Sequence, residues 1–176
     1  GNTTSAAVLV GAFTGLPADD VVGRGTGVDD ETYRRKVGVV DDALERVRGA
    51  DWRTVAAYAG GFEIVGLAGA LLAAAQRRIP VVLDGFIVSA AALLAQAIAP
   101  ASIGYCIAAH RSPESGHAAA LRRLELVPLL DLDLRLGEGS GAALALPLLD
   151  AAARMGREMK TFAQAGVATA NEPIQA

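Results

Sequence analysis

Apolar residues in this 176-residue chain gather into runs of two lengths, and the two lengths predict different elements. The shorter runs predict buried strands, because they are apolar throughout and too short for stable helices. The longer runs predict helices, several of which begin after capping or acidic residues. The expected strands are 79–85, 105–109 and 127–130, and the expected helices are 6–13, 31–47, 54–76 or 62–76, 88–99, 117–124 and 142–162.

The order of these elements predicts the fold class. Each apolar strand is followed by a helix, and this alternation is typical of βαβ units with a parallel sheet covered on both faces. We therefore expect an α/β protein. The sequence contains no internal repeat and no low-complexity linker. This indicates one domain over 1–165, followed by a frayed tail over 166–176.

Composition excludes several classes of function. Hydrophobic residues make up 52% of the chain, which excludes a disordered tail protein. The net charge of -3 gives no electrostatic footprint for nucleic acid or an anionic membrane, so neither partner is expected. Cys106 is the only cysteine in the sequence, so it cannot close an intramolecular disulfide, and a reducing cytoplasmic location is expected.

A membrane span is the alternative that needs weighing. Residues 85–110 contain no formally charged side chain, and this stretch is long enough to cross a bilayer. Pro100 and Gly104 divide it into a helix-length and a strand-length piece, which favours a soluble chain. Residues 1–7 lack the basic start and the long apolar stretch of a secretory signal.

Polar and glycine residues gather where the predicted strands end, at 84–85, 110–112 and 137–141. In open parallel sheets, ligands bind outside the carboxyl ends of the strands. This coincidence predicts a ligand site at that edge. His110 and His117 do not have a recognisable metal-ligand spacing, so no metal site is expected.

The loop 23–27 is rich in glycine and precedes a predicted helix. Its backbone N–H groups can approach a phosphate, and Arg34 or Lys36 can add a positive charge. The spacing matches neither a P-loop nor a dinucleotide-binding fingerprint, so a simple turn and helix cap stays the alternative.

Glu138 is the most specific candidate, because it lies between Gly137 and Gly139 just before a predicted helix. A carboxylate flanked by glycines is open to close approach by a ligand, and when desolvated it can act as a general base. An acidic residue in a tight turn at a helix start is the alternative. Arg111 and Ser112, at a strand end, are candidates for phosphate contact.

Several motifs together resemble a known family. Residues 130–143 resemble the C-terminal signature of nicotinate-nucleotide–dimethylbenzimidazole phosphoribosyltransferases. Four further motifs match in the family's order and at its approximate spacing: Gly1-Asn2-Thr3-Thr4, Gly25-Thr26-Gly27, Leu83-Asp84-Gly85-Phe86, and His110-Arg111-Ser112 with Gly116-His117. The resemblance covers nearly the whole chain.

The resemblance implies a Rossmann-like parallel sheet flanked by helices, a homodimer, and no cofactor. It implies transfer of phosphoribosyl from nicotinate mononucleotide to 5,6-dimethylbenzimidazole, which gives alpha-ribazole phosphate and nicotinate, in the synthesis of the lower ligand of cobalamin. Glu138 matches the family's general base, and Lys36 matches the lysine associated with the nucleotide phosphate. The other positions implied to bind substrate are Ser112, Gly1, Gly25, Gly27, Arg111, Gly137 and Gly139, with Asp84 and Thr3 near the site.

One departure from the family concerns the start of the chain. In the family, a long segment precedes the Gly-Asn-Thr-Thr motif and contributes much of the benzimidazole pocket, and that segment is absent from this sequence. The resemblance therefore predicts an incomplete fold that lacks the family's upstream half. The alternative function is a catalytically incomplete module that only binds nicotinate mononucleotide or its phosphate, or that associates with itself.

Overall fold

The computed structural model describes residues 2–24 and 27–167. The chain divides into two compact units, one ending at Ala145 and the other beginning at Leu146. The predicted domain boundary at residue 165 stays a prediction, because contact density alone does not define a folding unit.

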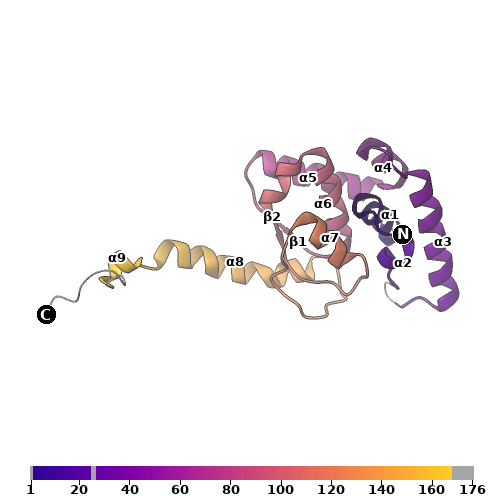
Figure 1. Ribbon diagram of the computed structural model, residues 1–176. Helices are drawn as coiled ribbons and strands as arrows, with labels where there is room; N and C mark the ends of the chain where they lie inside the picture. The colour runs from indigo at the N-terminus through magenta and orange to yellow at the C-terminus, as the bar shows by residue number, and fades with distance from the viewer. Residues whose placement is uncertain (1, 25–26, 168–176) are drawn as a thin grey trace. The chain divides into compact units, whose positions relative to one another are not determined.

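Helices form the first part of the larger unit (Figure 1). Local capping explains where two of them begin, since Asp29 and Asp51 accept hydrogen bonds from the backbone N–H groups three residues later. Gly60 and Gly61 divide the predicted helix 54–76 in two, and Gly61 has a positive φ of 67° that favours glycine. These helices are α1 (Asn2–Thr14), α2 (Ala18–Val21), α3 (Asp30–Arg46), α4 (Trp52–Ala59) and α5 (Phe62–Gln76).

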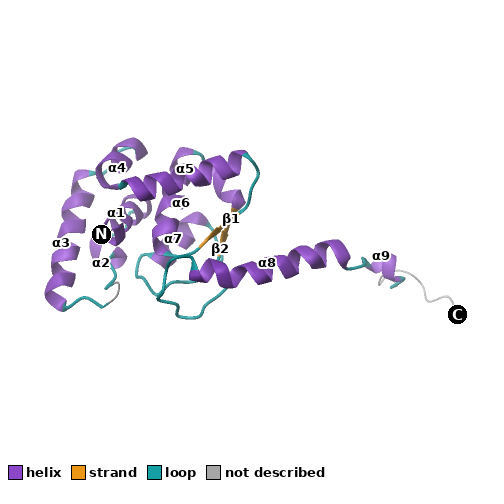
Figure 2. Cartoon of the chain, turned by 180° about the vertical axis from the view of Figure 1, so that it is seen from behind, coloured by secondary structure: helices purple, strands orange, loops and turns teal. Residues whose placement is uncertain are grey.

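A small parallel sheet follows (Figure 2). Strand β1 (Val81–Leu83) pairs in parallel with β2 (Cys106–Ala108). The crossover between them contains α6 (Phe86–Ile98) and the 3₁₀ helix η1 (Pro100–Tyr105). The predicted α/β class and the parallel pairing are therefore confirmed, with a smaller sheet than the sequence suggested.

The third predicted strand, 127–130, is wrong as a strand. Its backbone runs beside β2, where Leu129 and Leu130 donate to the carbonyls of Ala108 and Ala109, but only an isolated parallel bridge between His110 and Leu130 forms. Pro128 has no N–H group, and we attribute the short pairing to this missing donor.

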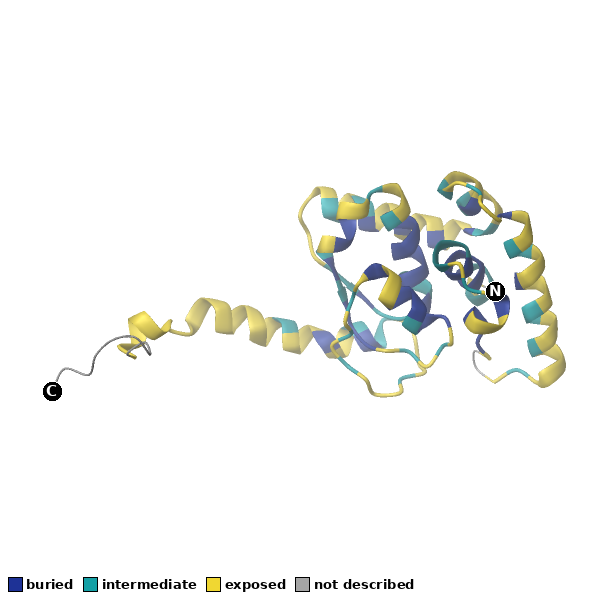
Figure 3. Cartoon of the chain, viewed as in Figure 1, coloured by how far each residue is buried: buried dark blue, intermediate teal, exposed yellow. Residues whose placement is uncertain are grey.

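Helix α6 lies at the centre of the hydrophobic core and is coloured mostly as buried in Figure 3. It packs against α1 and α5, and its run of buried alanines (Ala90, Ala91, Ala92) lets the helix backbones approach closely. No helix among the described residues is long and apolar enough to cross a membrane. The run 85–110 is instead divided among α6, η1 and β2.

The remaining helices are α7 (His117–Leu124), α8 (Ser140–Glu158) and α9 (Phe162–Ala165). The single helix predicted over 142–162 is therefore wrong in its extent, because α8 ends at Glu158 and Thr161 caps a separate short helix. Pro147 lies inside α8 and cannot donate a backbone hydrogen bond there. The boundary between the two compact units falls just before this proline.

Candidate active site

A cavity of about 580 Å³ lies in the larger unit, at the carboxyl ends of β1 and β2. The segments that line it come from distant parts of the sequence. They are Thr3 of α1, Gly23 and Arg24 before α3, Leu67 of α5, residues 84–88, His110, residues 112–115 and residues 134–139. The structure thus brings together residues from the three polar segments that the sequence singled out, two of which follow β1 and β2.

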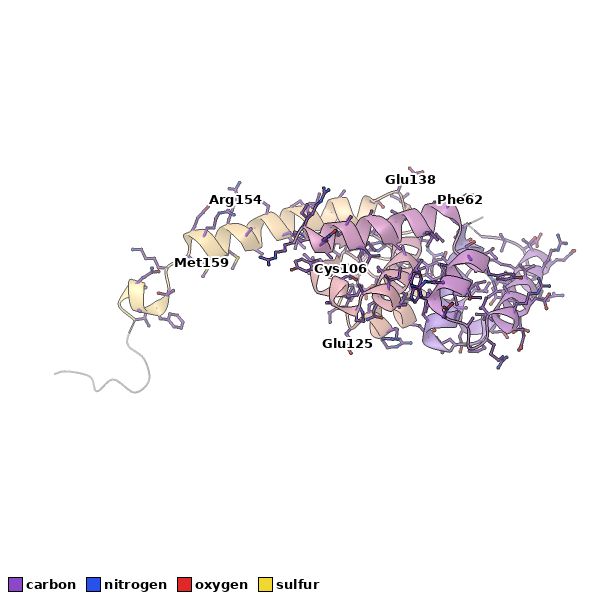
Figure 4. All side chains as sticks on the ribbon, turned by 90° about the horizontal axis from the view of Figure 1, so that it is seen from above. Phe62, Cys106, Glu125, Glu138, Arg154 and Met159 are labelled. Atoms are coloured by element: carbon purple, nitrogen blue, oxygen red, sulfur yellow. The ribbon has the colours of Figure 1, made fainter. Side chains whose placement is uncertain are left out.

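Glu138 occupies a strained turn beside this cavity. Gly137, Glu138 and Gly139 have φ angles of 74°, 54° and 80°, so three consecutive residues adopt the left-handed conformation. Glycine tolerates this conformation, but it costs a residue with a Cβ atom about 1–3 kcal/mol. The Glu138 side chain is exposed and projects away from the ribbon in Figure 4, so it is not desolvated by the described residues.

Asp84 holds this turn in place from the end of β1. Its carboxylate accepts hydrogen bonds from the backbone N–H groups of Gly139, at 3.2 Å, and Ala142, at 3.0 Å. One side chain therefore satisfies donors in the turn and in the first turn of α8. A negative charge at this position also complements the positive end of the helix dipole.

His110 is buried behind the same turn, with only 4% of its surface exposed. Its Nε2 atom is 3.9 Å from Asp84 Oδ1, and its Nδ1 atom has no hydrogen-bond partner in the part of the chain that the structure describes. A Cβ atom added at Gly141 would overlap the His110 ring. Glycine at position 141 therefore allows α8 to begin against His110.

His117 fixes the backbone of Ser112, another cavity residue. The Ser112 N–H donates to His117 Nδ1 at 2.8 Å, and His117 Nε2 lies 3.1 Å from Ser89 Oγ. Burial, with a smaller contribution from the nearby His110, lowers the pKa of His117 to about 4. The ring is thus neutral at pH 7, with Nδ1 as acceptor, so its proton is on Nε2 and is donated to Ser89 Oγ.

Lys36 reaches the cavity wall from α3. Its Nζ atom donates to Thr3 Oγ1 at 3.3 Å and to the Gly23 carbonyl at 3.0 Å, and both of those residues line the cavity. Burial lowers the pKa of Lys36, and the negative charge of Glu114 opposes this effect. These contacts hold the ammonium group at the cavity edge, where it can attract an anion.

Comparison with known proteins identifies the family. The phosphoribosyltransferase family model matches residues 1–167. This chain belongs to the nicotinate-nucleotide–dimethylbenzimidazole phosphoribosyltransferase family.

The relatives in this family are similar to nearly the whole of this chain. The nicotinate-nucleotide–dimethylbenzimidazole phosphoribosyltransferase of Chloroflexus aggregans is 54% identical over 97% of this chain and 49% of that protein. The Roseiflexus sp. (strain RS-1) protein of the same name is 55% identical over 95% of this chain and 48% of its own length. The crystal structure of CobT from Thermus thermophilus superposes with a TM-score of 0.89 at 53% identity, covering 96% of this chain and 50% of that chain. The chain thus spans about half the length of these relatives.

Not all of the predicted substrate-binding residues that the structure describes line the cavity. Arg111 is exposed and lies 3.6 Å from the Asp131 carboxylate, and Arg111 and Gly27 are not among the described residues that line the cavity. Gly1 and Gly25 lie outside the described residues. By contrast, the predicted positions Ser112, Gly137, Glu138 and Gly139 all line the cavity.

Sequence reasoning missed two polar residues of the cavity region. Glu114 lines the cavity itself, and His117 acts on the cavity through the backbone N–H of Ser112. The contacts of both side chains depend on packing between segments that are distant in the sequence. Within the described part of the chain, no group of three or more His, Cys, Asp or Glu side chains could hold a metal ion.

Proposed function

We propose that this chain carries the nucleotide side and the general base of an enzyme that transfers phosphoribosyl from nicotinate mononucleotide to 5,6-dimethylbenzimidazole. The products are alpha-ribazole phosphate and nicotinate, in cobalamin lower-ligand synthesis. One observation carries this proposal. The Gly137–Gly139 turn, Ser112 and the Lys36 contacts surround one cavity, in a chain that is 54% identical to a relative named for this reaction.

The proposed chemistry balances without an added reagent. One ring nitrogen of the benzimidazole attacks the anomeric carbon of the ribose, and the bond from that carbon to the pyridinium nitrogen breaks. The bonding electron pair returns to the positively charged ring nitrogen, so nicotinate leaves without a proton or a metal. The N–H proton of the benzimidazole passes to the Glu138 carboxylate, which is the role of a general base.

The backbone geometry around Glu138 supports this role. The glycines on both sides leave the carboxylate accessible, and Asp84 fixes the turn through two backbone N–H groups. The carboxylate is exposed in the described chain, and we propose that it becomes desolvated when the substrates are bound.

Lys36 is proposed to bind the 5′-phosphate of the nucleotide. A charge-assisted hydrogen bond of this kind contributes about 1.5–3 kcal/mol, which is about 10- to 150-fold in affinity. The cytoplasmic location and the homodimer belong to this proposal and stay predictions.

Two measurements on the full chain test the function. Calorimetry with nicotinate mononucleotide should show binding, and chromatography should detect alpha-ribazole phosphate once dimethylbenzimidazole is added. Binding without product would instead identify a module that only holds the nucleotide. Absence of binding by a folded sample would overturn the proposal for this chain.

Lys36→Met gives a sharper test of the phosphate contact. We expect the variant to bind nicotinate mononucleotide about tenfold or more weakly, while its affinity for the phosphate-free nucleoside stays unchanged. Arg35→Met is a matched control, because Arg35 lies next along α3 but pairs with Glu31 on the exposed face. Equal losses for nucleotide and nucleoside would show that Lys36 is structural.

A further inference from the structure

Glu114 is a carboxylate of the cavity that the proposed chemistry does not use. It lies in the loop between β2 and α7, and its backbone N–H is 3.4 Å from Ser112 Oγ. Its Oε2 atom is buried and has no hydrogen-bond partner in the described ranges 2–24 and 27–167. A buried acceptor without a partner is costly, so its presence in a cavity wall points to a ligand that supplies the donor.

The neighbouring Gly23 makes room for this carboxylate. A Cβ atom at position 23 would overlap Glu114 Oε2, so any larger residue there would displace the acid. The Gly23 carbonyl also accepts the hydrogen bond from Lys36 Nζ at 3.0 Å. One glycine therefore allows a cation and an anion to lie close together at the cavity edge.

The negative charge of the Glu114 carboxylate limits which groups of a ligand can donate a hydrogen bond to it. A carboxylate that carries its negative charge can only accept hydrogen bonds, so its partner must be a donor. An ionised carboxylate repels the phosphate and the ring carboxylate of nicotinate mononucleotide. The neutral donors left on that nucleotide are its 2′- and 3′-hydroxyl groups.

We propose that the Glu114 carboxylate accepts hydrogen bonds from the ribose hydroxyls of the nucleotide and thereby selects ribosyl over deoxyribosyl donors. This inference rests on the proposed function, because it assigns a part of the same substrate. The ribose lies between the 5′-phosphate at Lys36 and the anomeric carbon that reacts near Glu138. A carboxylate on this side of the cavity therefore complements the sugar, while the ammonium complements the phosphate.

Calorimetry on the full chain tests the inference with nicotinate mononucleotide and its 2′-deoxy and 3′-deoxy analogues. We expect at least one analogue to bind about tenfold or more weakly, since a hydrogen bond to a charged acceptor is lost. In Glu114→Gln this preference should shrink to within about threefold, because the amide is neutral and keeps one acceptor. Glu114→Ala should abolish the preference.

Glu125→Gln is the matched control, because Glu125 directly follows α7 at an exposed position and is not among the described residues that line the cavity (Figure 4). It should keep the parent's preference. Equal binding of all three nucleotides by the parent overturns the inference and leaves the proposed function intact. The same holds if Glu114→Gln weakens dimethylbenzimidazole binding but keeps the preference. A folded parent that binds none of the nucleotides overturns both proposals.

Discussion

The backbone around Glu138 is arranged at an energetic cost. A glutamate in the left-handed conformation is strained, and here it is held between two glycines that share the conformation. Such strain persists only where the surroundings enforce it, and the Asp84 carboxylate provides that enforcement through Gly139. The inference from this strain to a functional role can be tested at the side chain.

Glu138→Gln keeps the size of the side chain and removes its ability to accept a proton. In a preparation whose parent protein forms alpha-ribazole phosphate, we expect the turnover rate of the variant to be lower by a factor of about 10²–10⁴. This is the usual contribution of general acid–base catalysis. Affinity for nicotinate mononucleotide should stay nearly constant, because the phosphate contacts lie at Lys36. Turnover, calorimetry and the melting temperature are measured on the same preparation. A folded variant with the parent's rate would make Glu138 a turn residue.

The lowered pKa of His117 predicts how the free energy of unfolding depends on pH. The pKa of this residue falls from 6.5 to about 4 on folding, chiefly because of burial. Between these values the unfolded chain binds more protons than the folded chain, so the free energy of unfolding decreases as pH falls from 6.5 towards 4. The full effect is about 3 kcal/mol, taking 1.36 kcal/mol per pH unit.

The control for this pH effect is His117→Gln, which can accept and donate at similar positions but does not titrate. Urea unfolding at several pH values should show a steeper acid loss for the parent than for the variant. Parallel curves would mean that other groups dominate acid unfolding.

Individual site residues could be predicted from the sequence where the residues next to them in the chain form a recognisable motif. Glu138 is flanked by glycines, and Ser112 follows an apolar strand, so both were found among the cavity residues. The roles of Glu114 and His117 could not be predicted, because their neighbours come from segments distant in sequence, such as Gly23 and Ser89. Burial of a polar atom is a tertiary property that periodicity does not encode.

Elements were predictable where backbone chemistry is local. The apolar and capping patterns located α3 and α7 closely, because Asp29 caps the first and an apolar face defines the second. The break before α5 lies at the Gly60–Gly61 pair. The apolar pattern alone allowed a helix that begins at either residue 54 or residue 62. The strand predicted at 127–130 was shortened by Pro128, whose missing N–H outweighed its apolar neighbours.

The N-terminus of α8 is held by Asp84, which follows β1 and accepts hydrogen bonds from Gly139 and Ala142. Asp84→Ala removes the acceptor for two backbone N–H groups and should destabilise the fold by about 0.5–2 kcal/mol, as loss of a helix cap does. Hydrogen exchange at the Gly139 and Ala142 amides should accelerate markedly. Asp29→Ala is the control, because it removes the cap of α3 and should leave those two amides protected. Unchanged exchange rates at these amides in Asp84→Ala would show that the turn is stable without the Asp84 carboxylate.

The whole molecule exposes large apolar side chains that a single chain of this length leaves uncovered. On α8, Leu148 is 48% exposed and Met155 is 56% exposed, and they are seven residues apart on one helix face. Met159 follows Met155 by four residues, just past the end of α8, and is 64% exposed. The hydrophobic content of 52% does not locate such a surface, because its position depends on how the helix packs.

This apolar face of α8 predicts self-association, as expected for a chain whose family resemblance implies a homodimer. Burying a methionine side chain contributes about 1.5–3 kcal/mol, so Met155→Lys should weaken association about tenfold or more. Ala153→Lys adds the same charge on the opposite side of the helix, where Ala153 is also exposed, and should leave association unchanged. Sedimentation equilibrium over a range of concentrations measures both variants against the parent. If the parent stays monomeric throughout, or if both lysines weaken association equally, this face is not the contact.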